Sequence, residues 1–272
     1  MLENKPLHKI ENKHKKAKLI IFDLDGTLAP SKSDMDAEMA ELIKKLLEKK
    51  MVAVISGGSY EQFQKQFLAK LTSRPRFDLS ENPRSNLLKN LFLFPTSGST
   101  FYRYAANGWQ EVYAENLSEE EKRKVFEAFT KTFQESNHSH PEKTYGKVIE
   151  DRGTQITFSA VGQEAPLEVK GEWNKAHHAV RLKLATTLQT FLPDLEVQLG
   201  GLTSIDVTCK GIDKEYGIRQ IKKHLGIDFN EMLFVGDALF LGGNDSAALN
   251  TGVACFEVKG PEETKELIRA LL

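Results

Sequence analysis

Apolar and polar residues follow two different spacings in the first quarter of the chain. A short apolar run at residues 19–22 precedes a segment, 34–50, in which apolar residues recur at helical spacing between Lys and Glu. A second apolar run at residues 51–55 follows directly. A buried strand, an amphipathic helix and another buried strand form a β-α-β unit, which favours a parallel sheet. The pattern therefore predicts an α/β core.

The pattern changes after a third apolar run at residues 91–94. Short alternating segments then predict half-buried strands, and two longer periodic stretches predict helices. The predicted strands include residues 100–104, 155–159 and 204–208, and the predicted helices are residues 118–135 and 174–191. We expect these elements to form an inserted α+β domain, residues 99–210, in which helices cover an antiparallel sheet and which caps the first domain.

The core pattern resumes after the insert. A helix is predicted at residues 215–225, buried strands at 232–235 and 252–256, and a last helix from Pro261. Residues 1–98 and 211–272 are therefore predicted to form one core. A chain of 272 residues is long enough for two such domains.

Composition narrows the class of protein. The formal net charge of -1 gives no support to a nucleic-acid partner or a membrane-surface role. No apolar run is long enough to span a bilayer, and the N-terminus lacks the apolar centre of a signal peptide, so we expect a cytoplasmic protein. Cys209 and Cys255 lack metal-type spacing and are predicted to be reduced structural residues.

Two histidine pairs are candidate metal ligands. His138 with His140, and His177 with His178, lie in polar surroundings without carboxylate or Cys partners at ligand spacing. The sequence therefore favours an exposed position for both pairs.

Two carboxylates stand where the first predicted strand ends. Asp23 and Asp25 follow the apolar run, and Gly26 and Thr27 come next. Ligands bind at the carboxyl ends of strands in α/β sheets, and side chains at i and i+2 point the same way. Both carboxylates can thus hold a hard divalent cation and leave an oxygen free to attack. Thr27 offers a hydroxyl and a backbone N–H to an anion. The complete D-x-D-G-T pattern disfavours the alternative that this is an acidic turn with only a structural role.

A small hydroxyl-bearing turn follows the second predicted strand. Ser56, Gly57, Gly58 and Ser59 precede a predicted helix at residues 61–71. Hydroxyls and backbone N–H groups at the start of a helix can bind phosphate oxygens. Ser-Gly-Gly-Ser is also a common loop and N-cap, and only the position at a strand end favours phosphate binding.

A second junction between a strand and an acidic turn follows residues 232–235. Asp237 and Asp245 would share the edge of the sheet with the first pair and complete an oxygen-rich cage of the kind that Mg²⁺ prefers. Asn244, beside Asp245, is a candidate substrate contact. Lys214, at the start of a predicted helix, supplies compensating positive charge.

Together, D-x-D-G-T, SGGS, Lys214 and the GD…GGND stretch resemble, in order, the four motifs of the haloacid dehalogenase superfamily of aspartate-nucleophile phosphotransferases. The resemblance implies a Rossmann-like core, Mg²⁺ and an aspartyl-phosphate intermediate. Asp23 would be the nucleophile and Asp25 the general acid and base. Ser56, with Ser59 as the alternative, would steady the phosphoryl group. The metal ligands implied are Asp23, Asp25, Asp237 and Asp245.

The insert sharpens the resemblance. Its place after the third core strand is similar to the IIB branch, with its C2B-type cap, which contains Cof-type sugar phosphatases and eukaryotic phosphomannomutases. The stretches FDLDGTLAP, FPTSG, IEDRGTQITFSAVGQ, GGLTSIDV, KGIDKEYGI and GGND resemble the phosphomannomutases in the same order. This resemblance implies that Arg152, Ser204 and Asp206 face a hexose phosphate, and it suggests a homodimer formed through the cap. Ser204 and Asp206 would share one face of a strand.

Two departures from the phosphomannomutase pattern affect the expected reaction. Two arginines with which that family grips the distal phosphate fall on Tyr145 and Gln163 here, and neither residue can supply the charge. Lys143, Lys147 and Arg103 are candidates for compensation. The lost arginines favour water as the acceptor of the phosphoryl group, whereas the extended resemblance favours a sugar.

Three functions follow from these observations. We expect a Mg²⁺-dependent phosphohydrolase that acts on a sugar phosphate or a related small phosphomonoester. The alternative is a phosphomannomutase. A non-enzymatic phosphosugar-binding module is disfavoured because a binder has no chemical need for the complete catalytic set, and Mg²⁺-dependent turnover that vanishes in Asp23→Asn would eliminate it.

Overall fold

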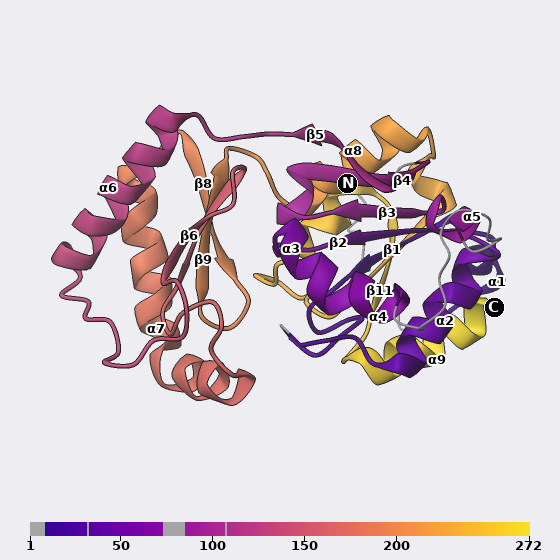
Figure 1. Cartoon of the computed structure of the whole chain (residues 1–272), viewed down its shortest axis with the longest axis horizontal. Coiled ribbons are helices and arrows are strands. Elements are labelled where there is room, and N and C mark those ends of the chain that lie inside the picture. Colours follow the sequence, from indigo (N-terminus) through magenta and orange to yellow (C-terminus); the bar gives the residue numbers. More distant parts are fainter. Residues whose placement is uncertain (1–8, 32, 73–84, 107) are drawn as a thin grey trace. The chain divides into compact units, whose positions relative to one another are not determined.

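The chain forms two compact units in a computed structural model, which describes residues 9–31, 33–72, 85–106 and 108–272. Met1–Ala114 and Asp213–Leu272 together form the core unit, and Glu115–Ile212 form the inserted unit. Each unit has its own sheet and its own hydrophobic core (Figure 1).

A seven-stranded sheet organises the core unit, in the order β11-β10-β1-β2-β3-β4-β5. The five strands from β11 to β3 are parallel, and β4 and β5 add an antiparallel hairpin at one edge. The strands are β1 (Leu19–Asp23), β2 (Met51–Ile55), β3 (Leu91–Phe94), β4 (Thr100–Ala105), β5 (Gly108–Ala114), β10 (Met232–Gly236) and β11 (Ala254–Glu257). The predicted parallel α/β core is confirmed.

Helices cover both faces of this sheet because successive strand residues point to opposite sides. Ile20 and Phe22 of β1 lie in one buried cluster with α2 (Ala37–Leu47) and α9 (Pro261–Leu271), whereas Leu19 and Ile21 lie in another cluster with α8 (Lys214–Leu225). The shorter helices are α1 (Asn12–Lys15), α3 (Tyr60–Phe63), a π-helix (Gln64–Leu68), α4 (Ala69–Thr72) and α5 (Ser85–Leu88). The result is a three-layer sandwich, with α8 on one side and α2 and α9 on the other (Figure 1).

The hairpin β4–β5 corrects the expected domain boundary. The alternating pattern predicts that residues 99–114 belong to the insert, but β4 pairs with β3, and β5 pairs with β4. Phe101 packs into the core cluster against Phe94, with stacked rings 4.5 Å apart. The inserted unit therefore begins at Glu115 and ends at Ile212.

The inserted unit is a four-stranded antiparallel sheet with two helices on one face. The strand order is β6-β7-β9-β8, and the strands are β6 (Ile149–Asp151), β7 (Gln155–Ser159), β8 (Leu195–Gly200) and β9 (Ser204–Cys209). α6 (Glu119–Glu135) and α7 (Leu167–Phe191) pack on the side of Phe158 and Val207. α7 begins earlier than the predicted residue 174 and has a non-helical residue, His177, in its interior.

Several expectations outside the sheets can also be compared with the structure. None of the helices in the part of the chain that the structure describes combines the length and the apolar character needed to cross a bilayer. Cys209 and Cys255 are both free. His138 is half-buried rather than exposed, because its ring packs against Phe133 and Phe158, and burial lowers its pKa.

Candidate active site

The parallel register brings two predicted acidic turns to the same edge of the core sheet. Phe22 of β1 lies opposite Val235 of β10, so Asp23, the last residue of β1, and Asp237, the residue after β10, lie at neighbouring strand ends. Asp23 also lies opposite Ile55, the last residue of β2, which places Ser56 at the same edge. The site is thus set by strand register, as the sequence predicts.

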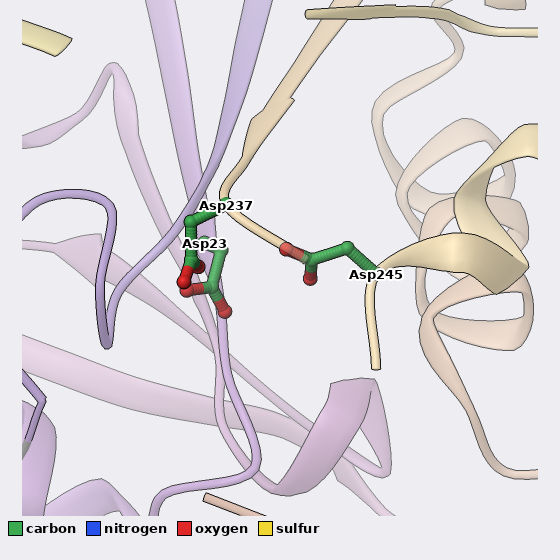
Figure 2. Close-up of side chains that lie close together, drawn as sticks. All are labelled: Asp23, Asp237 and Asp245. Carbon is green, nitrogen blue, oxygen red and sulfur yellow. The ribbon is translucent and has the colours of Figure 1, made fainter. Parts of the chain in front are cut away.

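Three carboxylates converge at this edge. One oxygen from each of Asp23, Asp237 and Asp245 lies within 4.8 Å of the others. Figure 2 shows them reaching toward one another from two strand ends and from the start of a short 3₁₀ helix (Ser246–Thr251). Asp23 and Asp245 are 2% and 0% exposed. This arrangement matches the oxygen-rich donor set that a hard divalent cation prefers.

Lys214 neutralises part of this buried charge. Its ammonium group donates to Asp23 Oδ1 and to Asp245 Oδ1. The lysine is the first residue of α8, and Asp213 caps the helix by accepting a bond of 2.9 Å from Tyr216 N. Burial alone would lower the pKa of the Lys214 ammonium group. The negative charges of Asp23 and Asp245 outweigh this effect and raise the pKa of Lys214. The lysine therefore stays protonated.

One ammonium does not satisfy three carboxylates. The pKa of Asp23 lies well above its usual range, mainly because the carboxyl group is buried. The charge of Lys214 lowers this pKa, whereas the charges of Asp245 and Asp237 raise it further. Burial, with the charge of Asp245, raises the pKa of Asp237 to about 6. Asp23 Oδ2 is buried and has no hydrogen-bond partner among the described residues. An unpaired carboxylate oxygen in this setting fits a cation ligand.

Two glycines make room for these carboxylates. A Cβ atom on Gly26 would collide with Asp237 Oδ2, and Gly26 has a positive φ of 89°. A Cβ atom on Gly236 would likewise collide with Asp245 Oδ2. Both positions need glycine because the backbone approaches a carboxylate too closely for any side chain.

The other predicted core residues surround the carboxylates differently. Thr27 Oγ1 donates to Asp237 Oδ1 at 3.2 Å, so it supports a candidate metal ligand as well as offering a hydroxyl. Asp25 is half-buried in the turn that follows β1, where it forms a β-bridge with Ala29, and its carboxylate is outside the group of three. Asn244 is exposed. The structure thus groups Asp237 and Asp245, rather than Asp25, with Asp23.

The two candidate serines have different surroundings. Ser56 is 3% exposed, and its Oγ accepts a long hydrogen bond of 3.3 Å from Gly58 N. Ser59 instead begins α3 in a capping box, in which its backbone N–H donates to Gln62 Oε1 at 2.9 Å. Gly57 lies between them in the same turn. Because Ser59 has a capping role, the geometry favours Ser56 as the phosphate-binding hydroxyl.

The predicted residues of the inserted unit lie on the sheet face opposite α6 and α7. Ser204 and Asp206 alternate with Ile205 and Val207, which pack in the helix-covered core. Asp206 Oδ1 accepts a 2.8 Å hydrogen bond from Thr157 Oγ1 on the neighbouring strand. The shared face that the sequence predicts is therefore present.

Arg152 is held by partners that sequence reasoning missed. Its Nε donates to Glu150 Oε2 at 2.7 Å, and its Nη2 donates to Gln163 Oε1 at 3.2 Å. Gln163 occupies one of the two positions where an arginine was expected. Glu150, in β6, stands two residues before Arg152, which comes directly after that strand, and this spacing alone does not reveal the ion pair between them.

Two further buried cations of the inserted unit had no sequence signal. Lys170 is 3% exposed and donates to Gln163 O at 2.9 Å. Arg181 is 5% exposed and donates to the carbonyls of Gly200 and Gly201 at 2.9 and 2.6 Å. Both occur in a helix with ordinary charged spacing, which predicts solvent exposure rather than burial.

Comparison with solved structures supports the fold. An IMP-nucleotidase from Plasmodium falciparum superposes with a TM-score of 0.68 at 18% identity, covering 95% of this chain and 71% of that chain. A haloacid dehalogenase-like hydrolase from Bacteroides thetaiotaomicron superposes with a TM-score of 0.57 at 16% identity, covering 94% of this chain and 100% of that chain. At these identities the likeness concerns the fold, which is that of the haloacid dehalogenase superfamily.

Comparison with known sequences identifies the family to which the chain belongs. The phosphomannomutase of Saccharomyces cerevisiae is 26% identical over 95% of this chain and 96% of its own length. The phosphomannomutase of Spinacia oleracea is 30% identical over 85% of this chain and 86% of its own length. The family model described as eukaryotic phosphomannomutase matches residues 39–272. The chain therefore belongs to the eukaryotic phosphomannomutase family, within the haloacid dehalogenase superfamily.

Proposed function

We propose that this protein is a Mg²⁺-dependent phosphohydrolase that acts on a sugar phosphate or a related small phosphomonoester through an aspartyl-phosphate. The observation that carries the proposal is the buried, incompletely paired cluster of Asp23, Asp237, Asp245 and Lys214. Mg²⁺ held by these carboxylates would supply the positive charge that offsets repulsion between a carboxylate and a phosphate dianion.

In the first step, an oxygen of Asp23 attacks phosphorus, and the bond between phosphorus and the leaving oxygen breaks. Asp25, two residues further along the turn, gives its proton to that oxygen. Ser56 Oγ and the backbone of Gly57 donate to the phosphoryl oxygens, and Lys214 holds positive charge beside Asp23. Thr27 keeps Asp237 in place. The products are the free alcohol and the phosphorylated Asp23.

In the second step, water attacks the phosphorus of the aspartyl-phosphate. Asp25, now ionised, accepts the proton of this water, and the bond from phosphorus to the Asp23 oxygen breaks. Inorganic phosphate leaves, and both aspartates return to their starting states. A hexose phosphate that took the place of this water would make the same chemistry a mutase reaction.

The inserted unit supports water as the acceptor. A mutase must hold a second phosphate while its bisphosphate intermediate reorients, and arginine is best suited to that contact. Arg152 is engaged by Glu150 and Gln163, and Lys143 lies over the ring of Tyr145 at 4.9 Å from its centroid. Arg103 lies on β4 in the core unit and is not part of the insert. Arg152 and Lys143 already have partners, which weakens the case for a strong distal-phosphate site.

The family match favours a second candidate, phosphomannomutase activity. Phosphorus NMR of the protein with Mg²⁺ and mannose 1-phosphate, with and without a hexose bisphosphate, separates the two. Release of inorganic phosphate alone supports the hydrolase, whereas formation of mannose 6-phosphate overturns it in favour of the mutase. Asp23→Asn should abolish both the release of inorganic phosphate and the formation of mannose 6-phosphate. A variant that keeps its activity would contradict the assignment of Asp23 as the nucleophile.

We further propose a cytoplasmic homodimer formed through the inserted unit, without nucleic-acid or membrane partners. Phe126 of α6 and Val180 and Leu182 of α7 are 41%, 39% and 50% exposed, which is more apolar surface than a solvated helix needs. Sedimentation analysis should give the mass of a dimer for the wild type and of a monomer for Phe126→Asp. A monomeric wild type would contradict the proposal.

A further inference from the structure

The turn after β3 has an unusual backbone. Thr96, Ser97 and Gly98 are consecutive residues with φ of 49°, 57° and 84°. L-residues other than glycine rarely adopt these values, and such strain persists only where the surrounding structure holds it. Thr96 is 2% exposed, and its carbonyl accepts from Ser99 N at 3.1 Å and from Ser99 Oγ at 2.8 Å. We call Thr96–Gly98 the left-handed turn.

The left-handed turn holds the candidate phosphate-binding turn through the main chain. Ser97 N donates to Ser56 O at 2.8 Å, and Thr96 N donates to Gly58 O at 2.9 Å. These two bonds bracket Gly57. The left-handed backbone of Thr96 and Ser97 thus coincides with N–H groups that are directed at the Ser56–Gly58 backbone. The turn thus determines where Ser56 and the N–H of Gly57 can lie.

The same turn also contacts the first turn of α8. A Cβ atom on Gly98 would lie 2.5 Å from Gly217 Cα, and a Cβ atom on Gly217 would lie 2.9 Å from Ser97 O. Gly217 follows Lys214 by three residues, one helical turn later. The two glycine backbones therefore approach each other closely, and the Ile55 side chain packs beside them, where a Cβ atom on Gly217 would collide with its Cδ1. The hydroxyl of Tyr113, on β5, also fixes the turn by donating a hydrogen bond of 2.7 Å to Gly98 O.

We infer that the left-handed turn is a positioning element for phosphoryl transfer. It touches the Ser56 turn with one side and the Lys214 helix with the other, and it thereby fixes the hydroxyl and the ammonium relative to each other. Its role rests on the proposed function, in which both groups serve the transferring phosphoryl group. Residues Ser97 and Gly98 act through the backbone and make no contact with the substrate.

Gly98→Ala and Gly226→Ala form a matched pair that tests this inference. Both glycines have a positive φ, 84° and 67°, but a Cβ atom on Gly226, at the other end of α8, would meet nothing within 4 Å. Both alanine variants should melt at a lower temperature. Only Gly98→Ala should lower kcat, by about 10²-fold, because misplacement of about 1 Å is that costly. Equal kcat in the two folded variants would overturn the inference.

Ser97 provides a second test that does not depend on Gly98→Ala folding. Asn tolerates the left-handed conformation, whereas β-branched Val does not. Ser97→Asn should keep wild-type kcat, and Ser97→Val should lose at least tenfold in kcat with little change in KM. If the two variants have equal kcat, the turn is not a positioning element.

Calorimetric titration with tungstate in the presence of Mg²⁺ separates this inference from the proposed function. Tungstate mimics the phosphoryl oxygens, so its affinity reports the Ser56 and Lys214 positions without turnover. Gly98→Ala should bind at least tenfold more weakly than Gly226→Ala. A wild type that binds tungstate but hydrolyses no phosphate ester would contradict the proposed function alone, whereas equal affinities of the two variants would overturn the positioning role alone.

Discussion

The predicted site residues of the core unit and those of the inserted unit differ in how far they are paired within the protein. In the core unit, three carboxylates face one ammonium, which leaves two negative charges in excess when all four are ionised, and Asp23 Oδ2 has no partner among the described residues. In the inserted unit, Arg152 is paired with Glu150 and Gln163, and Asp206 is paired with Thr157. A buried group without a partner costs free energy unless a ligand completes it. We infer that a cation and a phosphate complete the site in the core unit, whereas Arg152 and Asp206 in the inserted unit already have partners within the protein.

The largest expected effect comes from Asp23→Asn, which removes the attacking carboxylate and leaves the shape of the site unchanged. Turnover should fall by about 10³-fold or more, because no other group can form the covalent intermediate. Initial rates of phosphate release measure the effect. The matched control is Asp194→Asn, an exposed acid of the inserted unit, which should keep wild-type rates. Comparable losses in both variants would contradict the role of Asp23.

Lys214→Met should be the most destabilising of these changes in the absence of Mg²⁺. It leaves Asp23 and Asp245 buried without a counter-charge, at a cost of about 3–5 kcal/mol in the free energy of unfolding. Lys265→Met is the control, because Lys265 is also buried but its partners Asp36, Glu38 and Glu262 are exposed, so its loss should cost about 1 kcal/mol or less. Urea denaturation measures both. Mg²⁺ should restore stability in Lys214→Met only. Equal losses in the free energy of unfolding of the two variants would contradict the expected difference between the carboxylate cluster and the surface ion pairs of Lys265.

The pH dependence of stability follows from the carboxylate cluster. The pKa of Asp237 is about 6 in the folded protein against an ordinary 3.8, so protons bind more tightly to the folded state. The contribution of protonated Asp237 is complete below 3.8 and is lost as the pH rises to about 6. Without Mg²⁺ the melting temperature should therefore fall across this window. Mg²⁺ should abolish the fall because it binds the ionised carboxylates, and a melting temperature that falls equally with Mg²⁺ would contradict a cation site here.

The smallest expected effect concerns the inserted unit. Glu150→Gln removes the charge that pairs with Arg152, so the guanidinium becomes available to an anionic substrate. KM for a hexose phosphate should fall by about threefold with kcat unchanged, in line with the ~0.7 kcal/mol of a partly solvent-screened charge contact. Glu142→Gln, at an exposed acid of the same unit, should change nothing. An increase in KM in Glu150→Gln would mean that the ion pair itself positions Arg152 for the substrate.

Much of the core and its candidate site could be predicted because the signals are local. Asp23 and Asp237 each follow a run of apolar residues, and parallel strands necessarily end at the same edge. The sheet that β4 and β5 join could not be predicted, since a half-buried alternating hairpin has the same sequence pattern in either unit. β4 pairs with β3, and Phe101 packs against Phe94, which are contacts that the alternating pattern alone does not specify.

The less local features of the site escaped prediction for related reasons. The sequence predicts both Asp25 and Asp237 as metal ligands, and only the path of the turn after β1 leaves the Asp25 carboxylate outside the group of three. Ser97 gives no sign of a left-handed backbone, because serine is not typical of that region. The burial of Lys170 and Arg181 depends on strand and loop carbonyls that approach α7 from elsewhere in the chain.

Direct mapping of the covalent intermediate tests the central claim most directly. The protein would be mixed with Mg²⁺ and a sugar phosphate, quenched in acid within one turnover, digested, and analysed by peptide mass spectrometry. We predict a phosphoryl group on Asp23, and none in Asp23→Asn. Turnover with no phosphorylated aspartate, or with the phosphoryl group on another residue, would contradict the account.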